Sequence, residues 1–361
     1  MSDVRYWIGF NRVPNIGPVR LGRLLDTFGD LETAWGASPT ALRSARLPKD
    51  ALESLLYWRG RMDLEREMTR VQDLGLKVVS WQDDDYPPLL RSIDDSPPLL
   101  YIKGELLPTD EWAVATVGTR SATTYGKEVT RRLATGLAQN GVTVVSGLAL
   151  GIDGVAHRSA LEAGGRTVAV FGCSLDTVYP ARHRSLAKRI SQAGALISDY
   201  PLGTKPEGRN FPPRNRIISG LSLGTVVMEA GAKSGSLITL RYALEQGRET
   251  FCVPGNIYAR SCAGTNGAIQ RGEAKLVTCV KDILEELNLT MVVEQTQMRE
   301  IVPETATEEA LLSCLSMKPV HIDDIVQQSE LTTSIVSSTL CMMELKGMVR
   351  RVDNMSYILA H

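Results

Sequence analysis

The chain has 361 residues, of which 43% are hydrophobic and 22% are charged, and its formal net charge at pH 7 is −1. This length exceeds what one hydrophobic core usually serves, so two or three domains are expected, and the composition excludes a disordered or collagen-like chain. No apolar run approaches the roughly 20 residues that span a bilayer, and the first residues carry no signal-peptide pattern. We therefore expect a cytoplasmic protein without a membrane segment.

The near-neutral total conceals a division of charge along the chain. Residues 201–275 carry ten Lys/Arg against five Asp/Glu, a net charge of +5, whereas residues 291–361 carry five bases against ten acids, a net charge of −5. A polyanionic ligand is therefore expected to meet the middle of the chain and to avoid its C-terminal part. The six cysteines form no C-x-x-C pair, and together with four histidines they predict no metal site or other cofactor.

Residues 1–75 predict a small helical domain. The turn at Val13–Pro18, followed by an apolar helical pattern, resembles a helix-hairpin-helix (SAM-like) unit, whose turn aims backbone N–H groups at a phosphate. A helical bundle whose corner binds no ligand fits the same pattern equally well. Residues 76–107, with a short strand at Leu76–Trp81 and two Pro-Pro steps, predict an extended, semi-rigid connector.

Residues 108–288 predict an α/β domain, an extended Rossmann-like fold with a doubly wound, mostly parallel sheet. Short, doubly apolar strands alternate there with amphipathic helices, as in sheets that are covered on both faces. The expected strands are Ala113–Val117, Val142–Val145, Thr167–Phe171, Ala195–Ser198, Thr225–Met228 and Thr250–Val253, and the expected helices include Tyr125–Gln139, Ile152–Ala163, Arg184–Gln192 and Ser236–Gln246. Ligands of such sheets bind at the carboxyl ends of the strands.

Glycine-rich turns follow four of these strands. They include Gly118-Thr119-Arg120 after the first strand and Ser234-Gly235-Ser236 after the fifth. Glycine permits close backbone approach, and the next helix presents free N–H groups to an anion. None matches a dinucleotide or triphosphate motif. The alternative is that these glycines only make tight turns, but several such loops at one sheet edge, with Arg and Lys among them, favour an anion site.

The segment Asn210–Gly220 gives the strongest local signal. Phe211 precedes Arg214, Asn215 and Arg216, a set suited to stacking a base and holding phosphates of a single strand. Residues two apart on a helix diverge by about 200°, so one arginine is expected to face phosphate while the other is structural. The alternative is a core phenylalanine with both arginines in surface ion pairs.

The ordered motifs of the central domain resemble the bacterial DNA-processing protein A family (DprA/Smf). The resemblance rests on Val117–Arg120, Val145–His157, Tyr179-Pro180, Ser198–Pro201, Phe211–Leu221, Glu229-Ala230, Ser234–Thr239 and Val253–Gly255. It implies binding of single-stranded DNA, self-association as a homodimer through the Rossmann-like domain, and delivery of the strand to a RecA-type recombinase in natural transformation and homologous recombination. By similarity, the DNA-binding residues are Gly118, Thr119, Arg120, Lys205, Arg209, Phe211, Arg214, Asn215, Arg216, Ser234, Gly235 and Ser236.

An enzymatic reading has less support from the residues. Asp153 and His157 lie four apart as acid–base partners could, but Asp153 stands at a helix start, where a carboxylate caps N–H groups. The alternative function is a Rossmann-like nucleotide or nucleoside-phosphate hydrolase, whose P-G-G-x-G-T-x-x-E loop carries a catalytic glutamate. Residues 233–239 hold no acid, and Glu229 precedes the turn, so we expect a protein that is not an enzyme and has no catalytic residues.

The C-terminal part predicts a linker at 289–307 and a winged-helix domain at 308–361. Helices are expected at Glu308–Ser316, Ile322–Gln328 and Thr333–Leu345, with Met348–Arg351 and Ser356–Leu359 as the wing. Winged helices commonly read DNA, but the third helix carries no base before Lys346, so a protein-contact or dimer element is favoured over a sequence-specific regulator.

Overall fold

The computed structural model describes residues 3–289, 305–315, 320–329, 331–345, 349–353 and 355–359. The chain divides into two compact units, Met1–Asn288 and Leu289–His361. Within the described residues, no helix is long and apolar enough to cross a membrane.

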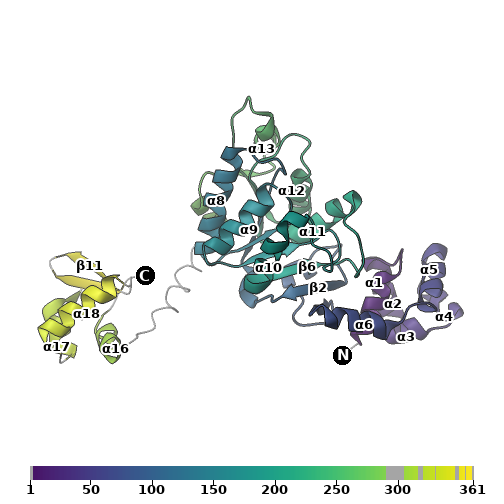
Figure 1. Cartoon of the computed structure of the whole chain (residues 1–361), viewed down its shortest axis with the longest axis horizontal. Coiled ribbons are helices and arrows are strands. Elements are labelled where there is room, and N and C mark those ends of the chain that lie inside the picture. The colour runs from purple at the N-terminus through teal and green to yellow at the C-terminus, as the bar shows by residue number, and fades with distance from the viewer. Residues whose placement is uncertain are drawn as a thin grey trace. The chain divides into compact units, whose positions relative to one another are not determined.

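Six helices build the N-terminal part of the first unit, which confirms the helical prediction (Figure 1). They are α1 (Val4–Arg12), α2 (Pro18–Phe28), α3 (Leu31–Gly36), α4 (Pro39–Ser44), α5 (Lys49–Arg59) and α6 (Leu64–Asp73). Asp3 caps α1 by accepting a hydrogen bond from the Arg5 amide, and Pro18 opens α2 after the turn. The apolar faces of these helices enclose Trp7 and Phe10, both 1% exposed or less.

These helices are joined to the neighbouring sheet by polar contacts. Asn11 donates to the carbonyl of Asp199 at 3.1 Å, and Arg12 donates to the carbonyl of Leu202 at 2.9 Å and to Glu67 at 2.8 Å. Loops after β6 therefore fix where the helical part sits against the sheet.

A nine-stranded sheet forms the centre of the first unit, in the order β1-β2-β6-β5-β4-β3-β7-β8-β9. The strands are β1 (Lys77–Ser80), β2 (Leu99–Gly104), β3 (Ala113–Val117), β4 (Thr143–Ser146), β5 (Thr167–Val170), β6 (Gly194–Ser198), β7 (Gly224–Val227), β8 (Glu249–Cys252) and β9 (Lys275–Leu276). All neighbours from β6 to β9 pair in parallel. The six predicted strands are present within one residue of their expected bounds, and the mostly parallel α/β fold is confirmed.

The segment 76–107 does more than connect two domains. Its strands β1 and β2 pair antiparallel with each other, and β2 pairs antiparallel with β6, so they extend the sheet by two strands. The proline steps lie between these strands, where Pro88 opens the short helix α7 (Pro88–Arg91). Sequence periodicity identified the first strand but not its partner, because Ser96–Tyr101 reads as a proline-rich loop.

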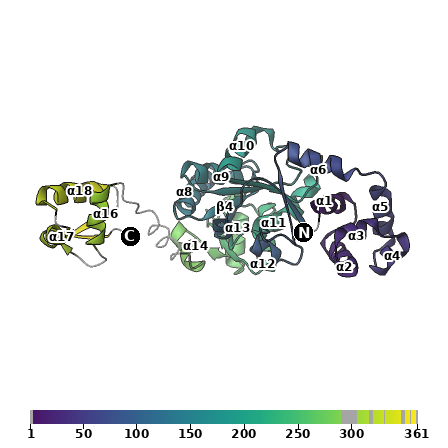
Figure 2. The same cartoon turned by 90° about the horizontal axis from the view of Figure 1, so that it is seen from below.

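The crossover helices divide between the two faces of the sheet, as Figure 2 shows. On one face lie α8 (Thr124–Gln139), α9 (Ile152–Glu162) and α10 (Arg184–Ala193), and on the other lie α11 (Phe211–Gly220) and α12 (Ser236–Glu245). The helices α13 (Ala263–Gln270) and α14 (Val280–Glu286) complete the unit. Right-handed crossovers explain the division, because the chain steps through β3, β4, β5 and β6 in one direction and returns through β7 and β8 in the other.

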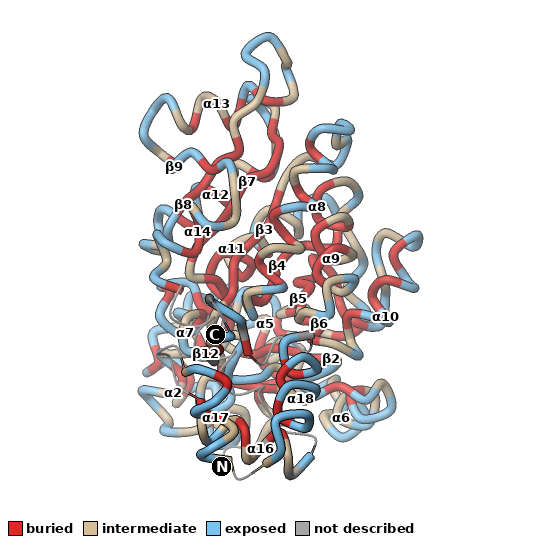
Figure 3. The backbone as a smooth tube through the Cα atoms, turned by 90° about the vertical axis from the view of Figure 1, so that its left-hand side faces the viewer, coloured by how far each residue is buried: buried red, intermediate tan, exposed pale blue. Residues whose placement is uncertain are grey.

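Alternation along the strands sends side chains into two cores. Leu99, Tyr101 and Leu196 belong to the core that includes α10 and the N-terminal helices, whereas Val145 and Val168 belong to the core under α11 and α12. The strands are accordingly the buried layer of the unit (Figure 3).

The second unit has the winged-helix architecture. Its elements are α16 (Ala306–Ser313), β10 (Val320–His321), α17 (Ile322–Ser329), α18 (Thr333–Leu345), β11 (Val349–Asp353) and β12 (Ser356–Leu359). The three helices and the wing confirm the prediction, while the expected ends at Ser316 and Met348 lie outside the described residues. Leu311, Ile325, Val336 and Leu340 form its small core.

Candidate functional site

A cleft of about 430 Å³ opens at the carboxyl ends of β3, β4, β5 and β7, where α11 and α12 begin. We call it the carboxyl-edge cleft. Eight of the twelve predicted DNA-binding residues line it: Gly118, Arg120, Phe211, Arg214, Asn215, Ser234, Gly235 and Ser236. The structure thus brings together three segments of the chain. The first of them, which ends at Arg120, lies more than 90 residues before the second, which begins at Phe211.

The first wall of the cleft is the loop after β3. The Thr119 amide donates to the carbonyl of Glu229 at 2.8 Å, and the Thr119 carbonyl accepts from the Ile152 amide at 3.2 Å. Gly151 has φ of 80°, and a Cβ there would lie 2.3 Å from the Thr119 carbonyl oxygen, so only glycine fits this approach. Thr119 therefore holds the loop through its backbone and does not line the cleft.

The second wall is the aromatic ring of Phe211 at the start of α11. The ring packs on the backbone of Gly172, where a Cβ would lie 2.6 Å from Phe211 Cδ1. The Tyr179 ring lies beside the Phe211 ring, with the two centroids 5.7 Å apart. The Arg120 guanidinium lies 5.4 Å from the centroid of the Phe211 ring. Tyr179 is 47% exposed, so the two rings form one partly exposed aromatic surface. The prediction omitted Tyr179, although its Tyr-Pro step was the available signal.

Arg214 forms the base of the cleft and is only 4% exposed. Its guanidinium donates to the carbonyls of Gly147, at 2.9 Å, and Val170. A Cβ at Gly147 would lie 2.6 Å from this guanidinium, so glycine there makes room for it. Burial lowers the pKa of Arg214 to about 10, against the attraction of nearby Asp153, and the side chain remains a cation at neutral pH.

Asp153 is the single acid among the residues that line the cleft. We expected it to cap helix α9, but Gly151 is the N-cap, and the Asp153 carboxylate accepts from the Gly147 and Ala149 amides at 3.2 and 3.3 Å. It fixes the loop before the helix rather than the helix itself. Burial raises the pKa of Asp153, while Arg214 and these amides favour its charged form.

The third wall of the cleft is the segment Ser234–Ser236 at the start of α12, and together with the exposed Arg120 it offers hydrogen-bond donors. Arg120 is exposed and pairs with no carboxylate of the described residues. Gly235 is the N-cap of α12, and no side chain caps this helix. The Leu237 and Ile238 amides donate to the Ser234 and Gly235 carbonyls, both at 3.1 Å, whereas the Gly235 and Ser236 amides donate to no group of the described residues. The hydroxyls of Ser234 and Ser236 lie 2.9 Å apart beside them. A helix start of this kind attracts an anion.

Besides Thr119, three predicted DNA-binding residues lie outside the cleft lining. Arg216 does not line the cleft, and its side chain, 12% exposed, pairs with Asp199 at 3.0 Å and Asp95 at 3.2 Å. Arg216 thus leaves α11 on a different face from Arg214 and is structural, as the sequence predicts for one of the two arginines. Arg214 lines the cleft but is buried and donates to two carbonyls, so it does not take the phosphate-facing position predicted for the other. Arg209 pairs with Glu207 at 2.8 Å on the surface, and Lys205 is exposed beyond the cleft lining.

Of the three residues of the enzymatic alternatives, Asp153 lines the cleft, but Glu229 and His157 do not. Glu229 is 1% exposed, and its Oε2 accepts from the Thr123 amide at 2.9 Å, which holds the loop before α8. His157 is fully buried, and its Nδ1 bonds with the Thr167 hydroxyl at 2.7 Å rather than with Asp153. Burial lowers the pKa of His157 to about 3, so it stays neutral.

Comparisons with known proteins agree along the length of the chain. A model of the DNA recombination-mediator protein A family matches residues 77–288, and a model of the DprA winged helix domain matches residues 295–355. Protein Smf of Synechocystis sp. is 34% identical over 99% of this chain and 98% of its own, and DNA processing protein DprA of Bacillus subtilis is 41% identical over 62% and 75%.

Solved structures of DNA processing protein A are among those similar to this chain. The X-ray structure of DNA processing protein A from Streptococcus pneumoniae has a TM-score of 0.70 at 33% identity and covers 79% of this chain and 99% of that one. A structure of DNA processing protein A from Helicobacter pylori, which concerns its single-stranded DNA binding mode, has a TM-score of 0.53 at 31% identity. It covers 59% of this chain and 96% of that one. The chain belongs to the DNA recombination-mediator protein A family.

Proposed function

We propose that the chain binds single-stranded DNA in the carboxyl-edge cleft and delivers it to a RecA-type recombinase in transformation and recombination. One observation carries the proposal: an unpaired Arg120, the aromatic surface of Phe211 and an uncapped start of α12 line the same cleft. The similar Helicobacter pylori structure, which concerns the single-stranded DNA binding mode of DNA processing protein A, supports this ligand.

Each wall has its own task in holding a strand. Arg120 contacts a phosphate, and the amides of Gly235 and Ser236 receive a second one together with the hydroxyls of Ser234 and Ser236. A base stacks against Phe211 and Tyr179, which is sequence-tolerant because every base has a π-face. Arg214 is committed to two carbonyls, so it supplies positive potential and supports Phe211 rather than reaching out to the strand.

The cleft is suited to hold a strand without cutting it. Catalysis by a hydrolase of the alternative class needs a carboxylate that reaches the substrate, but Asp153 is tied to two amides and Glu229 is enclosed behind the loop. We therefore propose a binding protein without catalytic residues.

Homodimer formation through the Rossmann-like domain, contact with the recombinase and a cytoplasmic location belong to the same proposal. The family assignment supports a role in recombination for the whole chain. Exposed apolar side chains near the end of β8, Ile257 at 79% and Tyr258 at 89%, offer a surface for self-association. Sedimentation of the full chain and of Tyr258→Ser tests that surface: dissociation of the variant supports it, and an unchanged mass removes it.

The DNA proposal is tested by titrating the full chain against labelled single-stranded and duplex DNA of equal length. Phe211→Ala is expected to weaken single-strand binding by about 1–3 kcal/mol, the contribution of one stacked base, while Phe211→Tyr retains it. Equal affinity of Phe211→Ala and the parent protein would contradict the role of this ring. Finding that a nucleotide is hydrolysed, with loss of turnover in Glu229→Gln, would restore the enzymatic alternative.

A further inference from the structure

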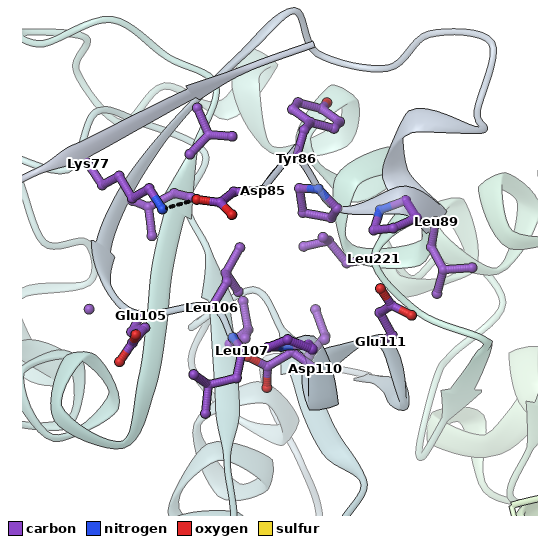
Figure 4. Close-up of a pocket in the computed structure, with 18 of the residues that line it drawn as sticks. Lys77, Asp85, Tyr86, Leu89, Glu105, Leu106, Leu107, Asp110, Glu111 and Leu221 are labelled. Carbon is purple, nitrogen blue, oxygen red and sulfur yellow. Dashed lines mark hydrogen bonds and ion pairs between the residues drawn. The ribbon is translucent and has the colours of Figure 1, made fainter. Parts of the chain in front are cut away.

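A second pocket, of about 640 Å³, opens at the opposite edge of the sheet (Figure 4). We call it the amino-edge pocket. It lies between the loop Asp84–Leu89 and the 3-10 turn Pro108–Glu111, next to the amino ends of β3 and β7. It is larger than the carboxyl-edge cleft, and it shares no residue with that cleft.

The pocket lies beyond the C-terminal end of α11, on one face of the sheet. The helices α8, α9 and α10 all cross on the other face, and on the face of the pocket α11 packs against β5 and ends at Gly220, directly before Leu221 in the pocket wall. The floor therefore consists of side chains that the sheet presents on this face: Val79, Ile102, Val145 and Val168. Leu106, Leu221 and Pro87 add apolar walls.

The rim of the pocket is acidic. Asp84, Glu105 and Glu111 are exposed, and none forms an ion pair with a cation of the described residues. Asp85 pairs with Lys77 at 2.5 Å, as Figure 4 shows, and Asp110 pairs with Arg166 at 2.7 Å. Lys77 is the single cation in the lining, so the pocket carries an excess of negative charge. It repels a DNA strand and attracts a cation.

We propose that the amino-edge pocket binds a basic segment of a partner protein, with an apolar side chain on the floor and flanking Lys or Arg side chains at Asp84, Glu105 and Glu111. Charge complementarity identifies the partner's chemistry, and the pocket volume lies in the range of sites that enclose a ligand of drug-like size, which leaves room for an anchoring side chain. A few anchoring side chains in desolvated pockets supply most of the affinity of protein interfaces, and the surrounding contacts exclude water.

The position of the pocket lets a partner and DNA bind at the same time. Helix α11 runs between the two sites, because Phe211 at its start lines the cleft and Leu221, directly after its end, lines the pocket. Ten helical residues span about 15 Å, so the two ligands meet opposite edges of the sheet. Binding of a partner in the amino-edge pocket is thus a function additional to DNA binding, and it does not depend on DNA binding.

The test uses the full chain and a fluorescein-labelled peptide of sequence Arg-Lys-Leu-Leu-Lys-Arg, read by fluorescence anisotropy. Two control peptides separate the contributions: replacing both leucines with serine removes the anchor, and replacing the basic residues with acids reverses the charge. The double variant Asp84→Lys/Glu111→Lys reverses two unpaired rim charges. The matched control, Glu162→Lys/Glu245→Lys, makes the same change in net charge at exposed, unpaired acids outside the pocket.

We expect the parent chain and the Glu162/Glu245 control to bind the basic peptide equally, and the Asp84/Glu111 variant to bind at least about tenfold more weakly. The parent chain should bind each control peptide at least about tenfold more weakly than it binds the basic peptide. Equal loss in both double variants, or binding that is indifferent to the leucines, would overturn the proposal, because each shows attraction by net charge alone. Single-stranded DNA binding by the Asp84/Glu111 variant is measured in parallel, so a failure of the DNA proposal is seen separately.

Discussion

Replacing Arg214 separates a supporting role from direct contact with DNA. Its guanidinium is 4% exposed and donates to the carbonyls of Gly147 and Val170. Arg214→Ala leaves these acceptors unpaired and removes the cation nearest the buried Asp153, a loss of about 3–5 kcal/mol in the free energy of unfolding. At about 2–4 °C per kcal/mol for a unit of this size, the melting temperature should fall by roughly 10 °C.

The assay is thermal unfolding of the full chain, followed by DNA titration at a temperature where each variant is folded. Arg120→Ala is the matched control, since this arginine is exposed and its loss should change stability by less than about 0.5 kcal/mol. Arg214→Lys keeps the charge but loses the fork of donors, and should fall between the two. A fully stable Arg214→Ala protein that no longer binds DNA would refute the reasoning, because Arg214 would then be a phosphate ligand.

Three further changes test other parts of the account. Gly172→Ala places a Cβ against Phe211, so single-strand affinity should fall while duplex affinity changes less; unchanged affinity would show that the ring position is unimportant. Arg216→Met leaves the carboxylate of Asp199 without its ion-pair partner, so the free energy of unfolding should fall by about 3 kcal/mol while the DNA affinity per folded molecule stays the same. Selective loss of DNA binding would contradict the structural role of Arg216. His157 has a folded pKa of about 3, so between about pH 6.5 and 3 the unfolded chain binds a proton that the folded chain does not, and stability should fall by up to about 1.4 kcal/mol per pH unit as pH decreases. His157→Gln should lose that component in acid denaturation.

The regular part of the fold was predictable from the sequence. The strands from β3 to β8 are short apolar runs bounded by glycine-rich turns, and each was located within one residue. The contribution of β2 was not predictable, because its two antiparallel pairings depend on residues 77–80 and 195–198, far from it in the chain.

The site was predictable as a set of segments rather than as a set of contacts. Parallel strands bring their carboxyl ends to one edge, so Arg120, Phe211 and Ser234 were correctly expected to lie together. Helical geometry predicted that the side chains of Arg214 and Arg216 leave the helix in different directions, but it did not predict which of them lines the cleft. That choice depends on Asp199 and Asp95, which tertiary structure alone brings to Arg216.

The amino-edge pocket was not foreseen because it has no motif. Its floor comes from four strands and its rim from two loops, and each residue reads locally as ordinary core or surface. The pocket depends on where α11 ends and on how two loops lie over the sheet, which is a property of the tertiary structure rather than of any one segment.

The central claim is that the carboxyl-edge cleft holds the phosphates and bases of a single strand. The most direct measurement is the salt dependence of binding of a labelled oligothymidine of about 20 nucleotides by the parent chain and by Arg120→Ala. We expect weaker binding by the variant at every salt concentration and a log–log salt slope that is smaller by about 0.7, the value for one phosphate contact on a single strand. An identical affinity and slope for the two proteins would contradict it.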